Sequence, residues 1–525
     1  MLEWMVGVCI VILVALVWPG APKYFGTESQ AGAPPQRGLG ITRHPAKERT
    51  GERWVLESGQ DGTTGDDSDA KASAVALICK PSALANYLLQ HCRAFSSYSP
   101  CVGWTWRASA LLQSLYEVCW PYHSPVQFVR DNLQMSDDGL VALDWAVAPA
   151  GTSQHKRRRT SSHSTRPVLL IVPNSFGKIT RNVLKLCEAA LYHGYLPVVF
   201  NRRSHNSTPL TTLKLQQFGD PGDLREAVRY IRYRQPAGRL YAVSESTGSG
   251  LLLSYLGECG SSSYVTAAVC LSPVFRCQSW FENGLWWPIR WALVLYQKMC
   301  LSRYRTVMSE SIQTDALFSS CSLRGLEEAL FCHTAQKGPT MVASAGGSTI
   351  SSSGNWDTYW ERNEPLRDVD EVAIPVLSVC AQDDPIRGSP HSTLPLELFE
   401  TNPHFFLLLT SRGGHCSFAT WASGGSTVST AGSVGDADSP SCVSGGTGSP
   451  EIGWSHRALL EFFRATTDFF AAEERVKQLA ARRRGLGGVT GGKVFRHRSV
   501  STCKRVPPCS HNIHAIYNWQ RSYTR

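Results

Sequence analysis

Short, continuous apolar runs alternate with stretches of helical spacing through the middle of the chain. Helical spacing occurs at about 178–193, from about Asp223 and from Gly248, between runs that are each short enough for one strand. Strands that are apolar throughout are buried on both faces, and strands that alternate with helices pair in parallel. The pattern predicts an α/β fold, with a mostly parallel sheet and helices on both faces. The predicted buried strands are residues 168–172, 196–200, 239–244, 265–270, 375–380 and 404–409.

The segments on either side of this alternation have other patterns. Residues 126–148 read as two strands that turn at Asp138-Gly139, which predicts a hairpin. Helical spacing begins near Cys79, an irregular helical region covers about 278–370, and an amphipathic helix is expected at about 455–480. The sheet domain is therefore expected to span residues 79–478.

The remaining segments are not expected to pack into this domain. Residues 1–20 contain fourteen consecutive apolar residues, fewer than the roughly 20 of a membrane span, and predict a signal anchor or a signal peptide. The protein is then membrane-associated through this segment, or enters the secretory pathway and is secreted if the segment is cleaved. Residues 21–75 have the composition of a disordered linker, and residues 482–525 form a basic tail. Polar insertions, expected in surface loops, lie at about 151–165, 337–354 and 422–449.

The charge distribution indicates which macromolecules the chain could bind, and the cysteine content bears on disulfides and metal sites. The chain has 525 residues and a net charge of +10, concentrated in clusters at 156–159, 482–484 and 493–505. Such clusters can bind anionic membranes or nucleic acid, but the sequence shows no basic fold with interleaved aromatics, so solvated loops and tails are favoured and no nucleic-acid partner is expected. The seventeen cysteines are odd in number and lack metal-ligand spacing. They favour buried thiols over a disulfide framework, and neither a metal nor a cofactor is expected.

Three residue types with complementary chemistry follow successive predicted strands. Ser246 lies in a sharp strand-to-helix turn, with Gly248 two residues later. Asp383 and Asp384 follow the strand at 375–380, and His415 follows the strand at 404–409 within a Gly-Gly turn. A serine becomes a nucleophile when a histidine takes its proton and an acid orients that histidine. The chain order Ser, Asp, His is that of α/β-hydrolases, and Asp383 or Asp384 can supply the acid.

The same site needs two backbone N–H groups to hold the negative charge of a tetrahedral intermediate. Thr247, directly after the nucleophile, would supply one of them. The other would come from the loop after the first parallel strand, "VPNSFGK", at Ser175. A glycine- and serine-rich turn that only packs a helix on a sheet is the alternative interpretation of this region.

Several segments resemble the AB hydrolase-4 (YheT-like) group of the AB hydrolase superfamily. They are "DDGLVALDW" at 137–145, "GDPGDLREAV" at 219–228, "LLLSYLGE" at 251–258, "DDP" at 383–385 and "GGH" at 413–415. The resemblance covers about 80–475 and implies an α/β-hydrolase fold with a helical cap insertion at about 278–370. It also implies the triad Ser246, Asp384 and His415. Its implied activity is hydrolysis of acyl esters of lipids, such as acylglycerols and phospholipids, at a membrane surface and within lipid metabolism.

The chain departs from the group's pattern beside the nucleophile and in the oxyanion loop. Ser244 and Asn174 stand where glycines are usual, and Glu245 adds a charge next to Ser246. These departures favour an alternative, in which a weak or inactive hydrolase fold regulates lipid metabolism by binding a protein partner. A cluster of aromatic residues in the cap region either packs the cap, lines an acyl pocket or touches lipid: Trp280, Phe281, Trp286, Trp287 and Trp291.

Overall fold

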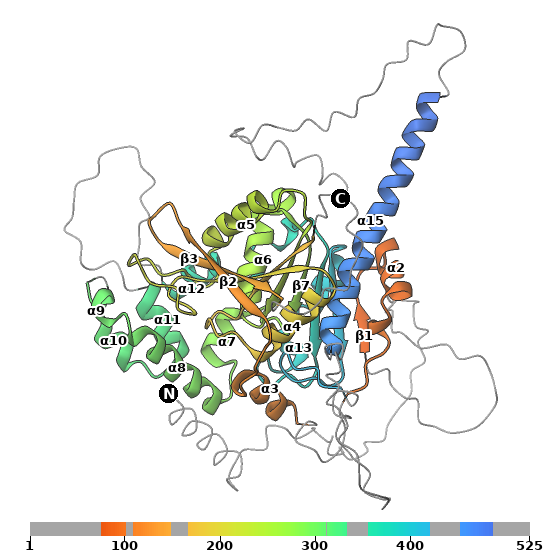
Figure 1. Ribbon diagram of the computed structural model, residues 1–525. Coiled ribbons are helices and arrows are strands. Elements are labelled where there is room, and N and C mark those ends of the chain that lie inside the picture. Colours follow the sequence, from red (N-terminus) through yellow and green to blue (C-terminus); the bar gives the residue numbers. More distant parts are fainter. Residues whose placement is uncertain are drawn as a thin grey trace, which may run out of the picture.

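A nine-stranded sheet forms the centre of the computed structural model, which describes residues 75–100, 109–148, 166–310, 312–332, 355–420 and 452–486 (Figure 1). Its strand order is β1-β9-β8-β7-β6-β4-β5-β3-β2. The strands are β1 (Val75–Ile78), β2 (Gln127–Gln134), β3 (Leu140–Val147), β4 (Val168–Val172), β5 (Leu196–Asn201), β6 (Leu240–Glu245), β7 (Val265–Leu271), β8 (Val376–Ala381) and β9 (Phe405–Thr410).

The sheet is parallel at its centre and antiparallel at both edges. Strands β4 to β9 pair in parallel, and their carboxyl ends therefore lie along one edge of the sheet. The hairpin of β2 and β3 pairs antiparallel with β5, and β1 pairs antiparallel with β9. This is the α/β-hydrolase fold that the sequence predicts. Each of the six predicted buried strands lies within one residue of its observed bounds.

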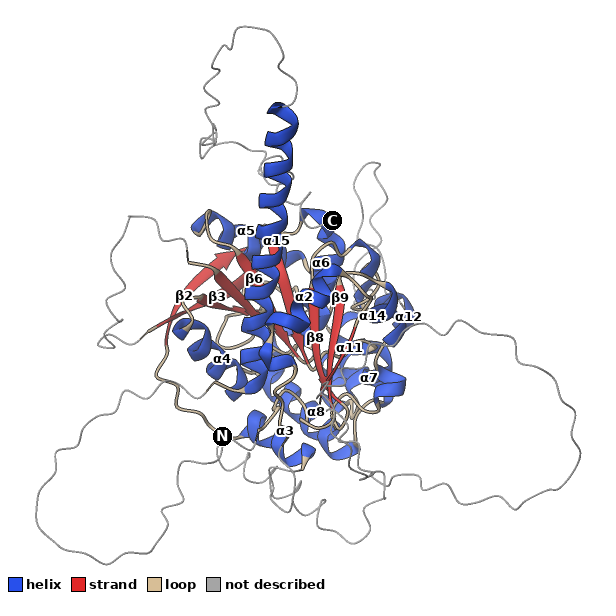
Figure 2. Ribbon diagram, turned by 90° about the vertical axis from the view of Figure 1, so that its right-hand side faces the viewer, coloured by secondary structure: helices blue, strands red, loops and turns tan. Residues whose placement is uncertain are grey.

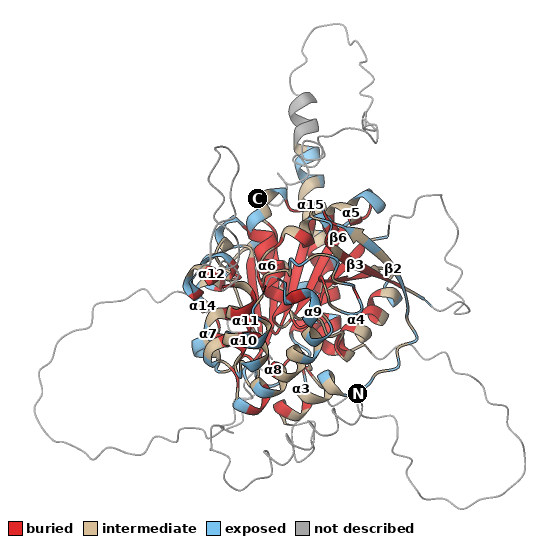
Figure 3. Cartoon of the chain, turned by 90° about the vertical axis from the view of Figure 1, so that its left-hand side faces the viewer, coloured by how far each residue is buried: buried red, intermediate tan, exposed pale blue. Residues whose placement is uncertain are grey.

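Helices cover both faces of the sheet because the buried strands present apolar side chains on both sides (Figures 2 and 3). One apolar layer contains Leu88, Leu186 and Phe463, and the other contains Leu224, Leu252 and Phe399. The first layer is built by α2 (Ala83–His91), α4 (Arg181–Tyr192) and α15 (Trp454–Leu486). The second is built by α5 (Gly222–Arg234), α6 (Gly248–Cys259) and α14 (Leu396–Thr401).

A group of helices lies between β7 and β8 in the sequence and has its own apolar cluster. Trp280 and Phe281 are buried in that cluster with Trp360, whereas Trp287 and Trp291 are 54% and 45% exposed. The aromatic residues of this region are therefore divided between packing and the surface. The helices are α7 (Cys277–Asn283), α8 (Trp287–Ser302), α9 (Arg305–Met308), α10 (Thr314–Ser319), α11 (Leu323–Phe331) and α12 (Trp356–Asn363).

The structure differs from the sequence-based boundaries at several points. Strand β1 begins at Val75, the last residue of the expected linker, and α15 continues to Leu486, into the expected basic tail. The rest of the linker and tail, the N-terminal segment 1–20 and all three polar insertions lie outside the described residues. Within the described ranges, no helix is long and apolar enough to cross a membrane, and the cysteines are free thiols, most of them at least partly buried.

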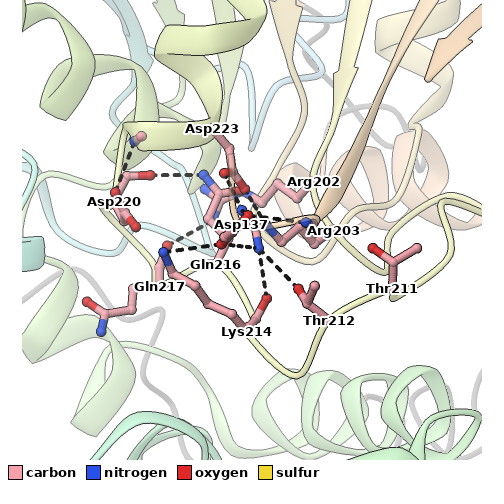
Figure 4. Close-up of polar contacts among 12 residues, drawn as sticks. Asp137, Arg202, Arg203, Thr211, Thr212, Lys214, Gln216, Gln217, Asp220 and Asp223 are labelled. Carbon is pink, nitrogen blue, oxygen red and sulfur yellow. Dashed lines mark hydrogen bonds and ion pairs between the residues drawn. The ribbon is translucent and has the colours of Figure 1, made fainter. Parts of the chain in front are cut away.

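Arg203 ties the β2–β3 hairpin to the parallel part of the sheet (Figure 4). Its Nε and Nη2 atoms each donate to Asp223 at 2.7 Å, and Nη1 and Nη2 each donate to Asp137 at 2.9 Å. The hydrogen bonds and the charge of Arg203 lower the pKa of Asp137 to about 2. A side chain at Gly139, in the hairpin turn, would overlap the Arg203 guanidinium. The predicted hairpin is thus held by a buried ion-pair network.

We expect Arg203→Met to lower the free energy of unfolding by about 3–5 kcal/mol, because it leaves the buried carboxylate of Asp223 without its cation. Arg225→Met is the matched control, since Arg225 pairs with Glu258 at an exposed site and should cost less than about 1 kcal/mol. Urea unfolding of both variants measures the difference. Equal losses would show that the Arg203 network contributes nothing specific.

Candidate active site

Ser246 lies in a tight turn between β6 and α6, at the carboxyl edge of the sheet. Its φ of +53° is in the left-handed region, which costs a residue other than glycine roughly 1–3 kcal/mol. The Ser246 N–H donates to the Leu271 carbonyl at 2.8 Å, which anchors the turn to β7. A Cβ atom at Gly248 would overlap the Pro173 carbonyl oxygen. Glycine at 248 therefore allows α6 to start directly against the loop after β4.

The three residues predicted as a triad are brought together. His415 Nε2 is 2.6 Å from Ser246 Oγ, and His415 Nδ1 is 2.8 Å and 3.0 Å from the two carboxylate oxygens of Asp384. A carboxylate only accepts hydrogen bonds, so Nδ1 carries the ring proton and donates it to Asp384. Nε2 is then the acceptor for the Ser246 hydroxyl proton. This is the arrangement a serine nucleophile needs.

The structure distinguishes the two adjacent aspartates that the residue pattern leaves open. Asp384 is buried and accepts the N–H groups of Ile386 and Arg387 at 2.9 Å and 3.0 Å. Burial alone would raise the pKa of Asp384, but the charge and hydrogen bond of His415 bring it below its ordinary value. Asp383 instead accepts the Gly414 N–H at 3.0 Å, and burial raises its pKa. Asp384 thus contacts the histidine, and Asp383 secures the histidine loop.

A helix that the sequence pattern did not reveal positions His415. Ser114, in α3 (Ala110–Cys119), accepts the His415 backbone N–H at 2.8 Å and donates its own proton to the Ala110 carbonyl at 2.6 Å. From the other side, Ser272 Oγ accepts the Cys416 N–H at 2.9 Å. Helical spacing could have indicated α3, but nothing in the sequence connects its serine with a loop some 300 residues later.

The two predicted oxyanion donors lie side by side, but one is already engaged. The Ser175 N–H donates to Thr247 Oγ1 at 3.0 Å, and the Ser175 hydroxyl donates to the same oxygen at 2.8 Å. The Thr247 side chain therefore occupies the N–H group expected to bind a developing oxyanion. Asn174, which replaces the usual glycine, holds the loop by accepting the Phe176 N–H at 3.2 Å and donating to the Lys178 carbonyl at 3.2 Å.

The two departures in β6 are also accommodated by polar contacts. Ser244 is fully buried, and its hydroxyl is 2.9 Å from that of Ser249 in α6. The Glu245 carboxylate accepts hydrogen bonds from Thr180 at 2.8 Å and from Asn182 at 3.0 Å, at the start of α4. Burial raises the pKa of Glu245. Residues at the start of α4 therefore supply the hydrogen-bond donors for the Glu245 carboxylate.

Comparison with the sequences of known proteins shows which family the chain belongs to. The chain is 45% identical to human Protein ABHD15 over 497 residues, which cover 92% of this chain and 95% of that protein. The chain belongs to the AB hydrolase superfamily. The match confirms the resemblance indicated by the sequence, which is most specific to ABHD15, alpha/beta-hydrolase domain-containing protein 15, in segments such as "WDTYWERNEPLRDVDE" at 356–371.

A second relative of this AB hydrolase is the mouse protein Phospholipase ABHD3, which is 27% identical over 352 residues, or 65% of this chain and 78% of that protein. No family model matches the chain. A solved esterase from Pyrococcus furiosus aligns with 61% of this chain and 89% of its own, at 12% identity and a TM-score of 0.33. Within the described residues, no group of three or more metal-ligand side chains could hold a metal ion.

A buried polar chain links the nucleophile strand of this AB hydrolase to its C-terminal helix. Asn182 Nδ2 donates to Glu245, so its Oδ1 is free to accept the Nε2 proton of His456 in α15, at 2.8 Å. This fixes His456 as the neutral ring protonated on Nε2, and burial lowers its pKa to about 3. The residue preceding the nucleophile is thus connected to α15 through one intervening side chain, that of Asn182.

We expect His456 to make the domain sensitive to acid. The unfolded chain binds a proton at this histidine near pH 6.5 and the folded protein only near pH 3, so the free energy of unfolding falls between these values by up to about 1.4 kcal/mol per pH unit. The stability is fully present above pH 6.5. His456→Gln should retain about 2 kcal/mol more of its stability than the wild type between pH 7.5 and pH 5. Urea unfolding at both pH values measures this, and His391→Gln, at an exposed histidine, should behave as wild type. Equal losses in all three proteins would contradict the expectation.

Proposed function

We propose that the protein is a serine hydrolase that cleaves carboxylic acyl esters of lipids, with Ser246 as nucleophile. The observation that carries the proposal is the position of His415, 2.6 Å from the Ser246 hydroxyl and 2.8 Å from Asp384. Ser, His and Asp side chains in this order activate a hydroxyl for attack on a carbonyl carbon. The hydrolase fold and the membership of the AB hydrolase superfamily support the same class of reaction.

In the proposed reaction, His415 transfers protons between Ser246, the leaving alcohol and water. Ser246 Oγ attacks the ester carbonyl while its proton moves to His415 Nε2, and Asp384 stabilises the charged imidazole. The tetrahedral intermediate collapses, the alcohol leaves with the proton from Nε2, and the acyl group stays on Ser246. Water then attacks the acyl-enzyme, giving its proton to Nε2, and the carboxylic acid is released as the proton returns to Ser246.

Turnover requires a rearrangement in the oxyanion loop. The Thr247 N–H and the Ser175 N–H are the proposed donors to the oxyanion, and the Ser175 N–H is bonded to Thr247 Oγ1. A substrate carbonyl oxygen must replace that hydroxyl before Ser175 can stabilise the intermediate. One such donor contributes about 3–4 kcal/mol in a tested enzyme, so this exchange controls much of the rate.

A lipid substrate is supported by the surroundings of the site and by one relative. A pocket beside Ser175 is lined in large part by apolar side chains, including Phe176, Phe281 and Leu330, which suit an acyl chain. The relative ABHD3 is named a phospholipase. We also propose that the segment 1–20 attaches the protein to a membrane, where such lipids are found.

The engaged Ser175 N–H favours one alternative, in which the fold is a weak or inactive hydrolase that regulates lipid metabolism by binding a protein partner. Both functions are compatible with the same sheet and the same triad distances. They differ in whether Ser246 reacts with an electrophile, which can be measured directly.

We expect a fluorophosphonate probe to label the purified protein at Ser246. Ser246→Ala should abolish labelling and lower ester hydrolysis by about 10⁴-fold or more, because the covalent step is lost. Ser249→Ala, which changes a buried serine three residues away, should keep the labelling. Folded wild-type protein that takes up no probe would exclude the hydrolase and leave the binding function.

We expect Thr247→Val to raise kcat for a short acyl ester by about 5-fold, because removing one neutral hydrogen-bond acceptor frees the Ser175 N–H without changing the shape of the side chain. Ser175→Ala removes only the second hydroxyl and should change kcat less. A fall in kcat for Thr247→Val would show instead that the Thr247 hydroxyl itself assists the reaction.

A further inference from the structure

The pocket beside the oxyanion loop is lined by polar as well as apolar side chains. It is bounded by the loops after β4 and β5 and by α8 and α11, and it encloses about 730 Å³ of empty space including its opening. Its polar lining includes Ser175 from the oxyanion loop, Arg202 and His205 from the loop after β5, and Glu327 from α11. A ligand in this pocket therefore contacts the oxyanion loop and these polar groups together.

Arg202 is a buried cation with two of its five N–H donors unused. It is 6% exposed, and its Nη1 and Nη2 atoms donate to the Phe218 carbonyl, each at 3.2 Å, with Nη1 also 3.4 Å from the Gln217 carbonyl. These contacts leave the Nε proton and one Nη2 proton without an acceptor among the described residues. Nε–H and this Nη2–H are parallel and form the fork that binds carboxylates and phosphates in a bidentate way.

In two other arginines of this chain, the same pair of N–H groups binds a carboxylate. Arg130 places Nε and Nη2 on Asp144 at 2.6 Å and 2.7 Å, and Arg203 places the same two atoms on Asp223, both at 2.7 Å. Arg202, drawn beside Arg203 in Figure 4, has no carboxylate within ion-pair distance in the described parts of the chain. A buried charge without a partner is strongly unfavourable, so this fork is suited to an anion from outside the chain.

The acidic groups in and around the pocket attract Arg202 at a distance but form no ion pair with it. Burial raises the pKa of Glu327 to about 7, and its carboxyl accepts the Tyr359 hydroxyl at 2.5 Å rather than pairing with Arg202. Burial lowers the pKa of His205 to about 4, so that ring is neutral at pH 7. Asp137 and Asp223 pair with Arg203 and, at Asp137, with Lys214. Arg202 is thus the cation of the pocket that no carboxylate of the described residues contacts directly.

We propose that the Arg202 fork binds an oxyanion of the ligand, a phosphate or a carboxylate, and that the preferred substrate is an acyl ester with an anionic group close to the ester. This inference rests on the proposed function for the hydrolytic step. Ser175 places the ester near Ser246, the aromatic lining receives the acyl chain, and Arg202 receives the anionic end. A phosphate would belong to an acylglycerol phosphate, whereas a carboxylate would belong to the fatty-acid product.

The binding test uses Ser246→Ala protein, so that its result does not depend on turnover. Three octyl ligands are compared by calorimetry: the ether analogue of octanoylglycerol phosphate, the neutral octylglycerol ether, and octanoate. We expect the phosphate analogue to bind at least about 10-fold more tightly than the neutral ether, as for a charge-assisted bidentate hydrogen bond. Adding Arg202→Met should remove this difference. Preference for octanoate over both ethers, lost in Arg202→Met, supports the same site with the product as its ligand.

The kinetic test uses otherwise wild-type protein and two esters with the same acyl chain. Arg202→Met should lower kcat/KM for octanoylglycerol phosphate by at least about 10-fold and leave that for octanoylglycerol within about 2-fold. Arg202→Lys keeps the charge but not the fork and should give an intermediate loss. Arg130→Met, whose fork faces Asp144, is the matched control and should leave the ratio of the two substrates unchanged.

The outcomes separate this inference from the proposed function. Equal binding of anionic and neutral ligands, or an equal loss for both esters in Arg202→Met, would overturn the anion site even if fluorophosphonate labels Ser246. Discrimination in binding without any hydrolysis would support the anion site and count against the hydrolase. Retained probe labelling in Arg202→Met shows that the variant is folded, so a loss of selectivity cannot be attributed to unfolding.

Discussion

The absence of a side chain at residue 248 determines how the site is assembled. Because α6 begins in contact with the Pro173 carbonyl, the loop after β4 lies directly beside the turn that holds Ser246. The same close approach leaves Ser246 with a φ of +53°, held through its N–H by Leu271 of β7. The oxyanion loop and the nucleophile are thus positioned by one backbone contact. His415 and Asp384 then need only reach the same edge of the sheet, which the parallel order of β6, β8 and β9 provides.

The unusual residues around this turn are integrated into the surrounding structure. Ser244 contacts Ser249, Glu245 contacts Thr180 and Asn182, and Asn174 bonds to its own loop. Buried polar groups are hydrogen-bonded in folded proteins generally, so these contacts explain how the fold accommodates the three residues and are compatible with either function. In an oxyanion hole that is ready to bind, the Ser175 N–H would be free. Here it donates to the Thr247 hydroxyl, while the distances within the triad are those of a serine nucleophile.

Elements whose structure depends on a local residue pattern could be predicted from the sequence. The six buried strands were predictable because each is a continuous apolar run, and the hairpin was predictable from alternation around Asp138-Gly139. Strand β1 was not, since four residues carry too little pattern and its partner β9 is remote in sequence. Ser246, His415 and an acid at Asp383 or Asp384 could be proposed from order and spacing, and the family resemblance selected Asp384. The contact of Ser114 with His415, the engagement of Ser175 by Thr247 and the open fork of Arg202 depend on side-chain directions across the fold, which no spacing rule supplies.

The pairing of β1 with β9 joins Val75 to Thr410, the first and last strand residues along the described chain. During synthesis at roughly 5–20 residues per second, β1 leaves the ribosome tens of seconds before the strand that it must join. In that interval its apolar side chains and backbone groups have no native partner in the sheet. Closing so long a segment is also slow in a free chain. This edge of the sheet therefore cannot be completed until residue 410 has left the ribosome.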